Sequence, residues 1–358
     1  MISYRKMNRR EALRYSGGVA ALAGVTGAKA SLRGGAITDV GNLRVGHYTD
    51  QRRPTGCTVI LFEPGAVAGV DVRGSAPGTR ETDLLQPLNT VQRVNAIVLS
   101  GGSAFGLDSA SGVMRYLEER KQGYRVGNVV VPIVPAAILF DLNVGDSNVR
   151  PDASSGYAAC QNAREDSVEE GNVGAGAGAT IGKFFGHGSA MKSGLGTASI
   201  RIGDSGLIVG AIVAVNAAGD VIDRRKGHVL AGALTPDGAQ FRNTMAHIAG
   251  GNLLAGAHSG HGENTTIGVI ATNAALTKTE ITKVAQMAHD GMARSINPIH
   301  TAADGDAIFA AATCTSRVKA DTITIGAIAA EAMSDAIEQA VLMAKSIPGY
   351  LARCDLRK

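Results

Sequence analysis

The sequence predicts a mixed α/β fold, and three observations lead to this prediction. Apolar runs of strand length recur along the chain and are separated by glycine-containing turns. In the last third they alternate with two long amphipathic helices, an order that is typical of a sheet covered by helices. The chain has 358 residues, 45% of them hydrophobic and 18% charged, which is enough apolar material for one large domain or two.

Two strands and a helix are expected in the first third of the chain. The strands cover residues 58–62 and 95–100, where apolar residues run almost without interruption. A glycine-rich turn over 101–106 follows the second strand and leads into a helix that ends near Arg120. This strand, turn and helix start together form either an anion-binding cradle or a close packing joint.

An arginine-containing loop, residues 71–85, lies between these strands. It alternates acids and arginines around Pro77-Gly78, which is typical of a rigid loop whose charges pair internally. Arg73 and Arg80 are candidate substrate-binding residues, because a guanidinium group can hold a carboxylate with two parallel hydrogen bonds. Pairing with the neighbouring acids is the alternative.

The stretch from 171 to 206 is very rich in glycine, and it resembles a phosphate-binding loop only at first sight. Phe184 stands where such a loop needs a serine or threonine, and Ala177 stands where it needs its first glycine. The match therefore fails. Lys183 nevertheless lies in a tight loop, where it can bring a cation close to a reacting carbonyl group.

A long apolar strand is expected over residues 207–215. Asn216 ends it, and its amide either caps a turn or points into a cleft as an oxyanion donor. The sequence then predicts a hairpin whose return strand covers 221–223. Residues 227–262 show little periodic pattern and are expected to form a surface linker.

The last third has the clearest pattern. Residues 262–273 change from a glycine-rich loop to a β-branched strand. Thr277 and Glu280 form a capping box that opens a long amphipathic helix. A strand over 307–314 and a helix over about 325–345 complete the order.

Asn264 and Thr265 lie where the loop becomes a buried strand, and this position suits self-cleavage. If the Thr265 hydroxyl attacks the carbonyl of Asn264, the peptide bond becomes an ester that water can hydrolyse. Thr265 then has a free α-amine beside its hydroxyl, and such an amine has a pKa of roughly 7.7–8.0. One residue thus provides both nucleophile and base. The alternatives are an ordinary strand start and an Asn-x-Thr glycosylation sequon.

Asp304 and Asp306 open a strand in the same way as Thr265. If the two strands are neighbours, both carboxylates lie near the hydroxyl and can orient it and hold the α-ammonium group. The alternatives are an Asp turn and a calcium loop, but the ligand series that a calcium loop requires is incomplete.

No metal site and no cofactor are expected. His258 and His261 have no partner cluster of Cys, His or Glu in register, so they are interpreted as loop residues. The four cysteines are widely spaced without a Cys-x-x-Cys motif and are expected to be buried free thiols. The chain also lacks the Gly-x-Ser-x-Gly and His-Glu-x-x-His motifs of two common classes of hydrolase.

The first 30 residues match a twin-arginine export signal. They contain Arg9-Arg10, a short and weakly apolar segment, and a final Ala28-Lys29-Ala30. The sequence therefore predicts a periplasmic or exported protein without membrane association after signal removal; a cytoplasmic protein with a basic tail is the alternative. The formal net charge of +4 is mild and partly due to this end, so nucleic-acid binding is not expected.

Several motifs together resemble the D-aminopeptidase and β-peptidyl aminopeptidase family of self-processing hydrolases, which includes the nylon-oligomer hydrolases. The motifs are Gly46-His47-Tyr48-Thr49-Asp50, Thr55 to Ile60, Asp71 to Leu85, Leu99 to Gly106, Pro132 to Ala137, Asn264-Thr265-Thr266, and His300-Thr301 with Asp304-Gly305-Asp306. The resemblance runs from residue 36 to about 345 and implies a four-layer α/β/β/α sandwich of the N-terminal-nucleophile-hydrolase type. It also implies cleavage into an α chain, residues 31–264, and a β chain, residues 265–358, and a homo-oligomer of these heterodimers.

The resemblance implies roles for individual residues as well. Carried over by position, Thr265 corresponds to the nucleophile of the Thr-type branch that contains the nylon-oligomer enzymes. The other functional positions of that branch fall at Lys183 for the cation, Asn216 for the oxyanion-hole amide, and Asp304 and Asp306 for the supporting carboxylates. Phe140 stands where some members have a tyrosine, so a phenolic hydroxyl is lost at this candidate substrate-binding position.

The sequence therefore predicts a self-processing N-terminal-threonine aminopeptidase or amidohydrolase that cleaves short peptides or amino-acid amides through an acyl-enzyme. Endo-type hydrolysis of ω-amino-acid, nylon-type oligomers is one alternative. Acyl transfer to an amine, as in ornithine acetyltransferases, is another. A binding scaffold without enzymatic activity is a third, and it predicts that the bond between residues 264 and 265 stays intact.

Overall fold

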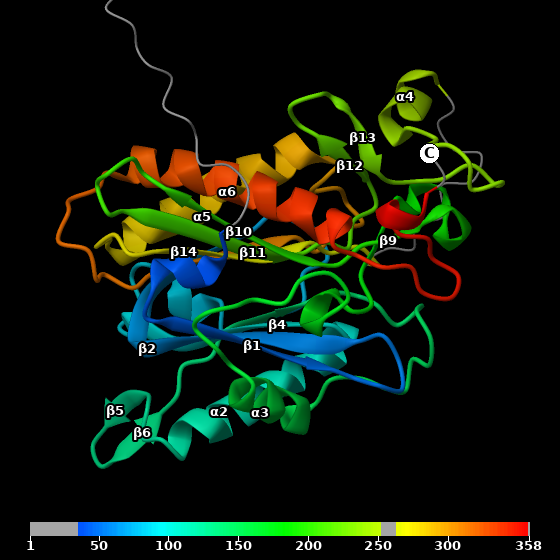
Figure 1. Ribbon diagram of the computed structural model, residues 1–358. Helices are drawn as coiled ribbons and strands as arrows, with labels where there is room; N and C mark the ends of the chain where they lie inside the picture. The colour runs from blue at the N-terminus through cyan, green and yellow to red at the C-terminus, as the bar shows by residue number, and fades with distance from the viewer. Residues whose placement is uncertain (1–34, 252–262, 357–358) are drawn as a thin grey trace, which may run out of the picture. The chain divides into compact units, whose positions relative to one another are not determined.

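The computed structural model describes residues 35–251 and 263–356, which belong to one compact unit, Arg33–Lys358. Within this unit the chain forms four layers: a pair of helices, two layers of β-sheet and a second pair of helices (Figure 1). The predicted α/β/β/α arrangement is therefore confirmed. The predicted export segment, residues 1–30, lies outside the described residues.

A single hydrogen-bonded sheet provides both sheet layers. Its strands in spatial order are β10 (Leu195–Arg201), β11 (Ile208–Ala214), β14 (Ile267–Thr272), β16 (Ala307–Ala312), β2 (Gly56–Val72), β4 (Arg93–Ser100), β7 (Ala136–Ile138) and β3 (Thr79–Arg80), with β1 (Leu43–Thr49) paired to β2. β2 joins the layers, because its residues 67–72 pair with β16 and its residues 57–61 pair with β4. A register shift between Leu61 and Ala66 separates the two parts.

Helices and shorter strands surround this sheet. The helices are α2 (Ser109–Glu118), α3 (Ala153–Gln161), α4 (Thr244–Ala249), α5 (Lys278–Ser295) and α6 (Thr322–Leu342). The short strands are β5 (Tyr124–Val126), β6 (Val129–Val131), β8 (Thr180–Ile181), β9 (Met191–Lys192), β12 (Asp220–Asp223), β13 (His228–Ala231) and β15 (Ile296–Asn297). β12, β13 and β15 form a small sheet of their own, and β5 pairs with β6 and β8 with β9.

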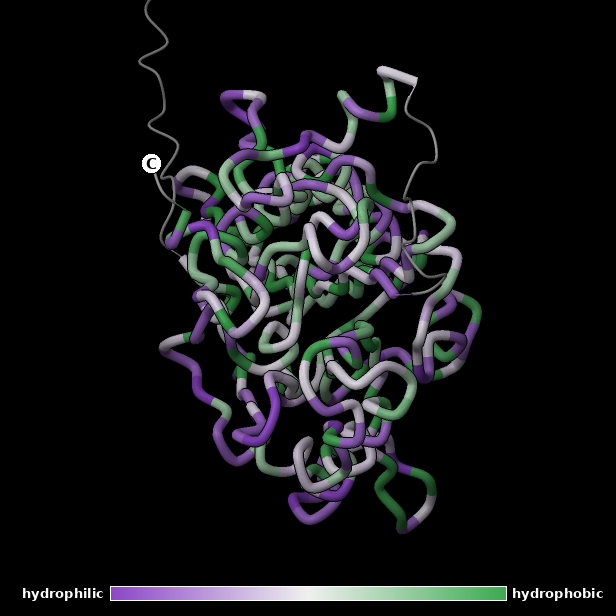
Figure 2. Tube along the Cα trace, turned by 90° about the vertical axis from the view of Figure 1, so that its right-hand side faces the viewer, coloured by the Kyte–Doolittle hydropathy of each residue, from purple (hydrophilic) through white to green (hydrophobic). Residues whose placement is uncertain are grey.

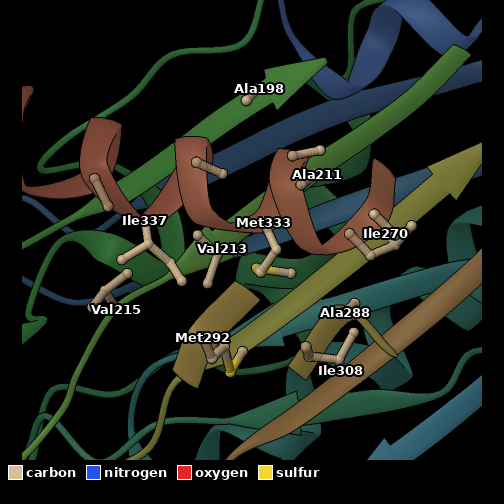
Figure 3. Close-up of a cluster of buried hydrophobic side chains, with 14 of the residues drawn as sticks. Ala198, Ala211, Val213, Val215, Ile270, Ala288, Met292, Ile308, Met333 and Ile337 are labelled. Carbon is tan, nitrogen blue, oxygen red and sulfur yellow. The ribbon is translucent and has the colours of Figure 1, made fainter. Parts of the chain in front are cut away.

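Three apolar layers hold the four structural layers together. Because successive side chains of a strand point to opposite faces, β16 sends Ile308 toward α5 and α6 and Phe309 into the space between the two sheet layers. Figure 3 shows the apolar layer between the sheet and the helices α5 and α6. In it, Met292 of α5 and Met333 of α6 lie against sheet residues such as Val213. The third layer lies between the second sheet layer and the helices α2 and α3.

The two long C-terminal helices begin at capping residues. α5 starts at the predicted capping box, in which the Thr277 hydroxyl accepts the Glu280 N–H and the Glu280 carboxylate accepts the Thr277 N–H. α6 starts slightly before the predicted position, because Asp321 caps it by accepting the Thr324 N–H over 2.8 Å.

Two predictions for the middle of the chain are wrong. The strands expected to form a hairpin over 207–223 do not pair with each other, since β11 pairs with β10 and β14 whereas β12 pairs with β13 and β15. The chain leaves the large sheet at Asn216, whose side-chain oxygen accepts hydrogen bonds from Thr180 and Lys183. The linker expected over 227–262 contains β13 and α4, which are too short to produce a periodic pattern in the sequence.

Hydropathy follows the layers. Figure 2 shows hydrophobic segments mainly inside the unit, while hydrophilic segments are frequent at its periphery. Within residues 35–251 and 263–356, no helix has the length and apolar character that crossing a bilayer requires.

Candidate active site

The bond between Asn264 and Thr265 lies just before β14, and the segment Asp304–Asp306 lies just before β16. These two strands are parallel neighbours in the large sheet, so their N-terminal ends meet at the same side. An isolated parallel bridge between Asn264 and Asp304 continues the pairing beyond the strands. The two strands are therefore neighbours, which is the condition under which the sequence brings both carboxylates near Thr265.

The carbonyl oxygen of Asn264 accepts two hydrogen bonds in the uncut chain. The Thr265 hydroxyl donates to it over 2.5 Å, and the Gly305 N–H donates to it over 2.8 Å. The Thr265 N–H itself donates to the carbonyl of Asn216 over 2.7 Å. Thr265 is only 2% exposed. A hydroxyl, the carbonyl group that precedes it and a backbone donor to that carbonyl therefore lie together in a site largely shielded from solvent.

The two aspartates hold different parts of this site. Asp306 accepts the Thr266 N–H at Oδ1 over 2.7 Å, and its Oδ2 lies 2.8 Å from the ring Nδ1 of His300. Asp304 accepts the N–H and hydroxyl of Thr301 at Oδ2, whereas its Oδ1 has no hydrogen-bond partner among the described residues. Burial, together with the nearby charge of Asp306, raises the pKa of Asp304. This carboxyl group therefore takes up a proton more readily than an exposed aspartate does.

Lys183 and Asn216 are buried partners in the same site. The Lys183 ammonium donates to Asn216 Oδ1 over 2.8 Å and to the carbonyl of Glu263 over 3.2 Å. Asn216 Oδ1 also accepts the Thr180 N–H, so its Nδ2 faces the carbonyls of Phe140, at 3.0 Å, and Glu263, at 3.4 Å. Burial lowers the pKa of Lys183 to about 7, although nearby carboxylates oppose this effect. Lys183 can therefore exchange a proton near neutral pH.

The three candidate substrate-binding residues have other contacts. Phe140 contributes its backbone carbonyl to the site, where it accepts Asn216 Nδ2. Arg73 pairs with Asp71 over 2.7 Å and donates to a backbone carbonyl of α5, which matches the internal pairing considered as the alternative. Arg80 donates to two side chains of α2. Among the described residues, neither guanidinium group forms a hydrogen bond to Thr265 or to the side chains that surround it.

The structure adds three features that the sequence analysis missed. The Gly305 N–H and the ring of His300 are two of them, and the third is the buried ion pair between Arg53 and Asp141, 2.5 Å apart. This pair fixes the segment that carries the Phe140 carbonyl. The residue type does not reveal which backbone N–H will act as a donor. For His300, its place in the motif with Thr301 and Asp304-Gly305-Asp306 is the indication that the sequence offers.

Metal ligands and disulfides do not organise the described part of the chain. Within residues 35–251 and 263–356, no cluster of three or more His, Cys, Asp and Glu side chains is arranged to hold a metal ion. The four cysteines are free thiols, of which Cys57 and Cys160 are buried, so the expectation of burial is met for two of them. His258 and His261 lie outside the described residues.

The fold is shared with N-terminal-nucleophile hydrolases. An L-aminopeptidase D-Ala-esterase/amidase from Ochrobactrum anthropi, described as a variant of that fold, has a TM-score of 0.66 at 19% identity, with 91% of this chain and 94% of that chain covered. A β-aminopeptidase from Burkholderia sp. has a TM-score of 0.63 at 23% identity, with 87% of each chain covered. At these identities the likeness establishes the fold class.

Sequence comparison establishes the family. The profile of Peptidase family S58 matches residues 35–354. An uncharacterised aminopeptidase of Mycobacterium tuberculosis (strain ATCC 25618 / H37Rv) is 44% identical over 341 residues, which cover 87% of this chain and 95% of the relative. The 6-aminohexanoate-oligomer endohydrolase of Kocuria sp. (strain KY2) is 31% identical over 319 residues, which cover 84% of each chain. The chain therefore belongs to peptidase family S58, and it is a hydrolase of peptide or amide bonds.

Proposed function

We propose that this protein is a self-processing N-terminal-threonine hydrolase that acts on short peptides or amino-acid amides. The observation that carries the proposal is the 2.5 Å contact between the Thr265 hydroxyl and the carbonyl oxygen of the preceding residue. Membership of family S58 supports the reaction class. The buried surroundings of Thr265 support its assignment as the nucleophile, because a nearby cation, amide and carboxylates act most strongly where water is excluded.

In the proposed self-cleavage, Oγ of Thr265 adds to the carbonyl carbon of Asn264. The carbonyl oxygen becomes an oxyanion, and the Gly305 N–H, 2.8 Å away in the uncut chain, is placed to stabilise it. The hydroxyl proton passes to the peptide nitrogen, the C–N bond breaks and an ester remains. Water then hydrolyses this ester, which leaves a carboxylate on Asn264 and both a free amine and a free hydroxyl on Thr265.

In the mature enzyme the same hydroxyl attacks an amide substrate. In the uncut chain the Thr265 N–H donates to the Asn216 carbonyl, and after cleavage the α-amine takes its place. The amine therefore stays beside the Thr265 hydroxyl and can accept the proton of that hydroxyl. The substrate carbonyl becomes an oxyanion that Asn216 Nδ2 and Lys183 can stabilise. The proton then passes to the leaving amine, an acyl ester forms on Thr265, and water releases the acid.

Denaturing mass spectrometry tests the proposal directly. The active protein should contain two chains, the smaller beginning at Thr265, and Thr265→Ala should remain uncut and inactive. Thr266→Ala is the matched control, because the hydroxyl of Thr266 has no partner among the described residues and its hydrogen bonds come from its backbone N–H and carbonyl, which alanine keeps. A single intact chain in a preparation that hydrolyses its substrate would refute the proposal.

Endo-type cleavage of longer amide chains is a second candidate, and the position of Glu263 favours it. The Glu263 carbonyl accepts Lys183 Nζ, and its Oε2 lies 2.9 Å from Nε2 of His187. The site therefore holds a second residue on the acyl side of the bond, as the substrate of an endo-hydrolase requires. The relative named 6-aminohexanoate-oligomer endohydrolase supports this candidate. Amino-acid p-nitroanilides compared with an amide oligomer in one assay would separate the two substrate classes.

Export and assembly remain predictions. The twin-arginine segment, residues 1–30, lies outside the described residues, and one chain is described. N-terminal sequencing of the protein from a periplasmic fraction tests export. Light scattering after size-exclusion chromatography tests the predicted homo-oligomer of α/β heterodimers.

A further inference from the structure

Two histidines continue the hydrogen-bonded contacts of Asp306 away from the nucleophile. The Nδ1 of His300 lies 2.8 Å from Asp306 Oδ2. The Nε2 of His300 lies 3.3 Å from Nδ1 of His289, and the two rings meet edge to face with their centres 4.7 Å apart. The Nε2 of His289 lies 3.0 Å from the carbonyl oxygen of Asp71. These contacts link the segment that precedes β16, helix α5 and the end of β2.

The chemistry of these contacts fixes where the protons are. A carbonyl oxygen accepts but never donates, so His289 must carry a proton on Nε2 to bond with Asp71. His289 is completely buried, and this burial lowers its pKa to about 4, so near neutral pH its Nδ1 carries no proton. His300 must then donate from Nε2. Both nitrogens of His300 thus face acceptors, one of them a carboxylate.

One proton is consequently shared between His300 and Asp306. If Asp306 is ionised, His300 carries protons on both ring nitrogens and is an imidazolium ion. If His300 is neutral, the proton is on Asp306 Oδ2. The same Oδ2 also accepts the backbone N–H of His300 over 3.1 Å, which favours the ionised carboxylate. Its other oxygen, Oδ1, holds the Thr266 N–H over 2.7 Å.

We propose that His300 is a positioning residue, which keeps Asp306 ionised and aligned beside the nucleophile, and that His289 fixes the ring of His300 for this purpose. The proposal rests on the proposed function, since it assigns His300 a role in the reaction of Thr265. His300 acts through Asp306 and not on the substrate. Its backbone has a φ of 57°, in the left-handed region that His and Asn tolerate better than most residues.

The charges around the pair determine what happens when the imidazolium is removed. Asp304 and Lys183 interact electrostatically with Asp306, and Asp71 and Arg73 interact with His289. Without the imidazolium, the negative charge of Asp306 is balanced less completely, and this like charge disfavours ionisation of Asp304. The pKa of Asp304 should therefore rise further, and the acid limb of the pH–rate profile should move to higher pH.

Substitutions that preserve single hydrogen bonds test this proposal. His300→Asn keeps a donor toward Asp306 and tolerates the left-handed backbone, but it cannot carry the charge. His289→Gln keeps a donor toward the Asp71 carbonyl but has no ring nitrogen at the position of Nδ1 to accept from His300. Both variants should still be cut, with kcat lower by about 10- to 100-fold and with the acid limb of kcat/KM shifted up by roughly one pH unit. His228→Asn, at an exposed position, is the matched control and should match the wild type.

Nitrogen-15 NMR of histidine-labelled protein gives a readout that does not depend on activity. The His300 signals, identified by their absence in His300→Asn, should show two protonated ring nitrogens at pH 7. A singly protonated His300 ring, or an unchanged acid limb in His300→Asn, would overturn the proposal. If the wild type is neither cut nor active, the proposed function fails, and the NMR measurement still decides whether the proton is shared as described.

Discussion

The Lys183→Met substitution, made in the uncut Thr265→Ala background, measures the effect of the buried amine on stability. Lys183 is 2% exposed, and burial lowers its pKa from the ordinary 10.5 to about 7. Methionine has a similar volume but cannot be charged. Its introduction leaves Asn216 Oδ1 bonded to the Thr180 N–H and the Glu263 carbonyl facing Asn216 Nδ2, so neither acceptor loses all its partners.

The size and sign of the effect follow from linkage between protonation and folding. Between pH 7.5 and 9.5 the amine of Lys183 is mainly neutral in the folded state and charged in the unfolded state. The unfolded state therefore binds more protons, so the free energy of unfolding rises with pH, by about 1.4 kcal/mol per pH unit. This gain in the free energy of unfolding is lost as the pH falls to about 7, since below that pH the amine is charged in both states. Over two pH units, the parent should gain about 3 kcal/mol relative to Lys183→Met.

Urea unfolding at pH 7.5, 8.5 and 9.5 measures this difference. Each titration compares the parent with the Lys183→Met variant, so all other titrating groups cancel to first order. Lys226→Met is the matched control, because the Lys226 side chain is 73% exposed and should leave the pH dependence unchanged. A difference between parent and Lys183→Met that stays constant over this pH range would refute the buried-amine assignment.

Three further substitutions address the reaction and the fold. Gly305→Ala would place a Cβ within contact distance of the Ala76 carbonyl oxygen and 2.8 Å from Thr265 Oγ1, which forces the Gly305 N–H and Thr265 apart, so self-cleavage followed on a denaturing gel should slow by about 100-fold; cleavage at the wild-type rate would contradict this geometry. Asn216→Ala should lower kcat of the cut enzyme by about 10²- to 10³-fold, as measured with a p-nitroanilide substrate; an unchanged kcat would exclude an oxyanion role. Thr277→Ala should lower the free energy of unfolding by about 1 kcal/mol through loss of the α5 cap, and an altered kcat in this variant would contradict a purely structural role.

The periodic elements of the fold could be predicted, but the way β2 joins the two sheet layers could not. Periodicity and the capping box locate α5, because both signals come from neighbouring residues. The sequence predicts a strand only over 58–62, since Pro64 normally ends a strand. In the structure β2 continues to Val72 after a register shift and pairs with β16. Only pairing with distant strands defines such a strand.

The side chains of the site could be predicted more fully than its backbone groups. Thr265 and Asp304 each stand at the start of an apolar strand, and parallel pairing is enough to bring them together. The donor to the Asn264 carbonyl is the Gly305 N–H, and every residue except proline carries such a group. The hydrogen bond of Arg73 to a carbonyl of α5 depends on tertiary packing, so the sequence left the role of Arg73 open.

Parallel pairing also implies that the proposed cut at this bond would leave the sheet intact. Parallel neighbours need a crossover connection, and α5 provides it, so the N-terminal ends of β14 and β16 meet on one side. The Asn264–Thr265 bond precedes the first residue of β14, whose ladder from Ile267 onward pairs with strands on both sides. After cleavage the new terminus would remain held through the Thr266 N–H on Asp306 and the α-amine near the Asn216 carbonyl. The contacts that position the bond for attack would thus also position the nucleophile that the attack creates.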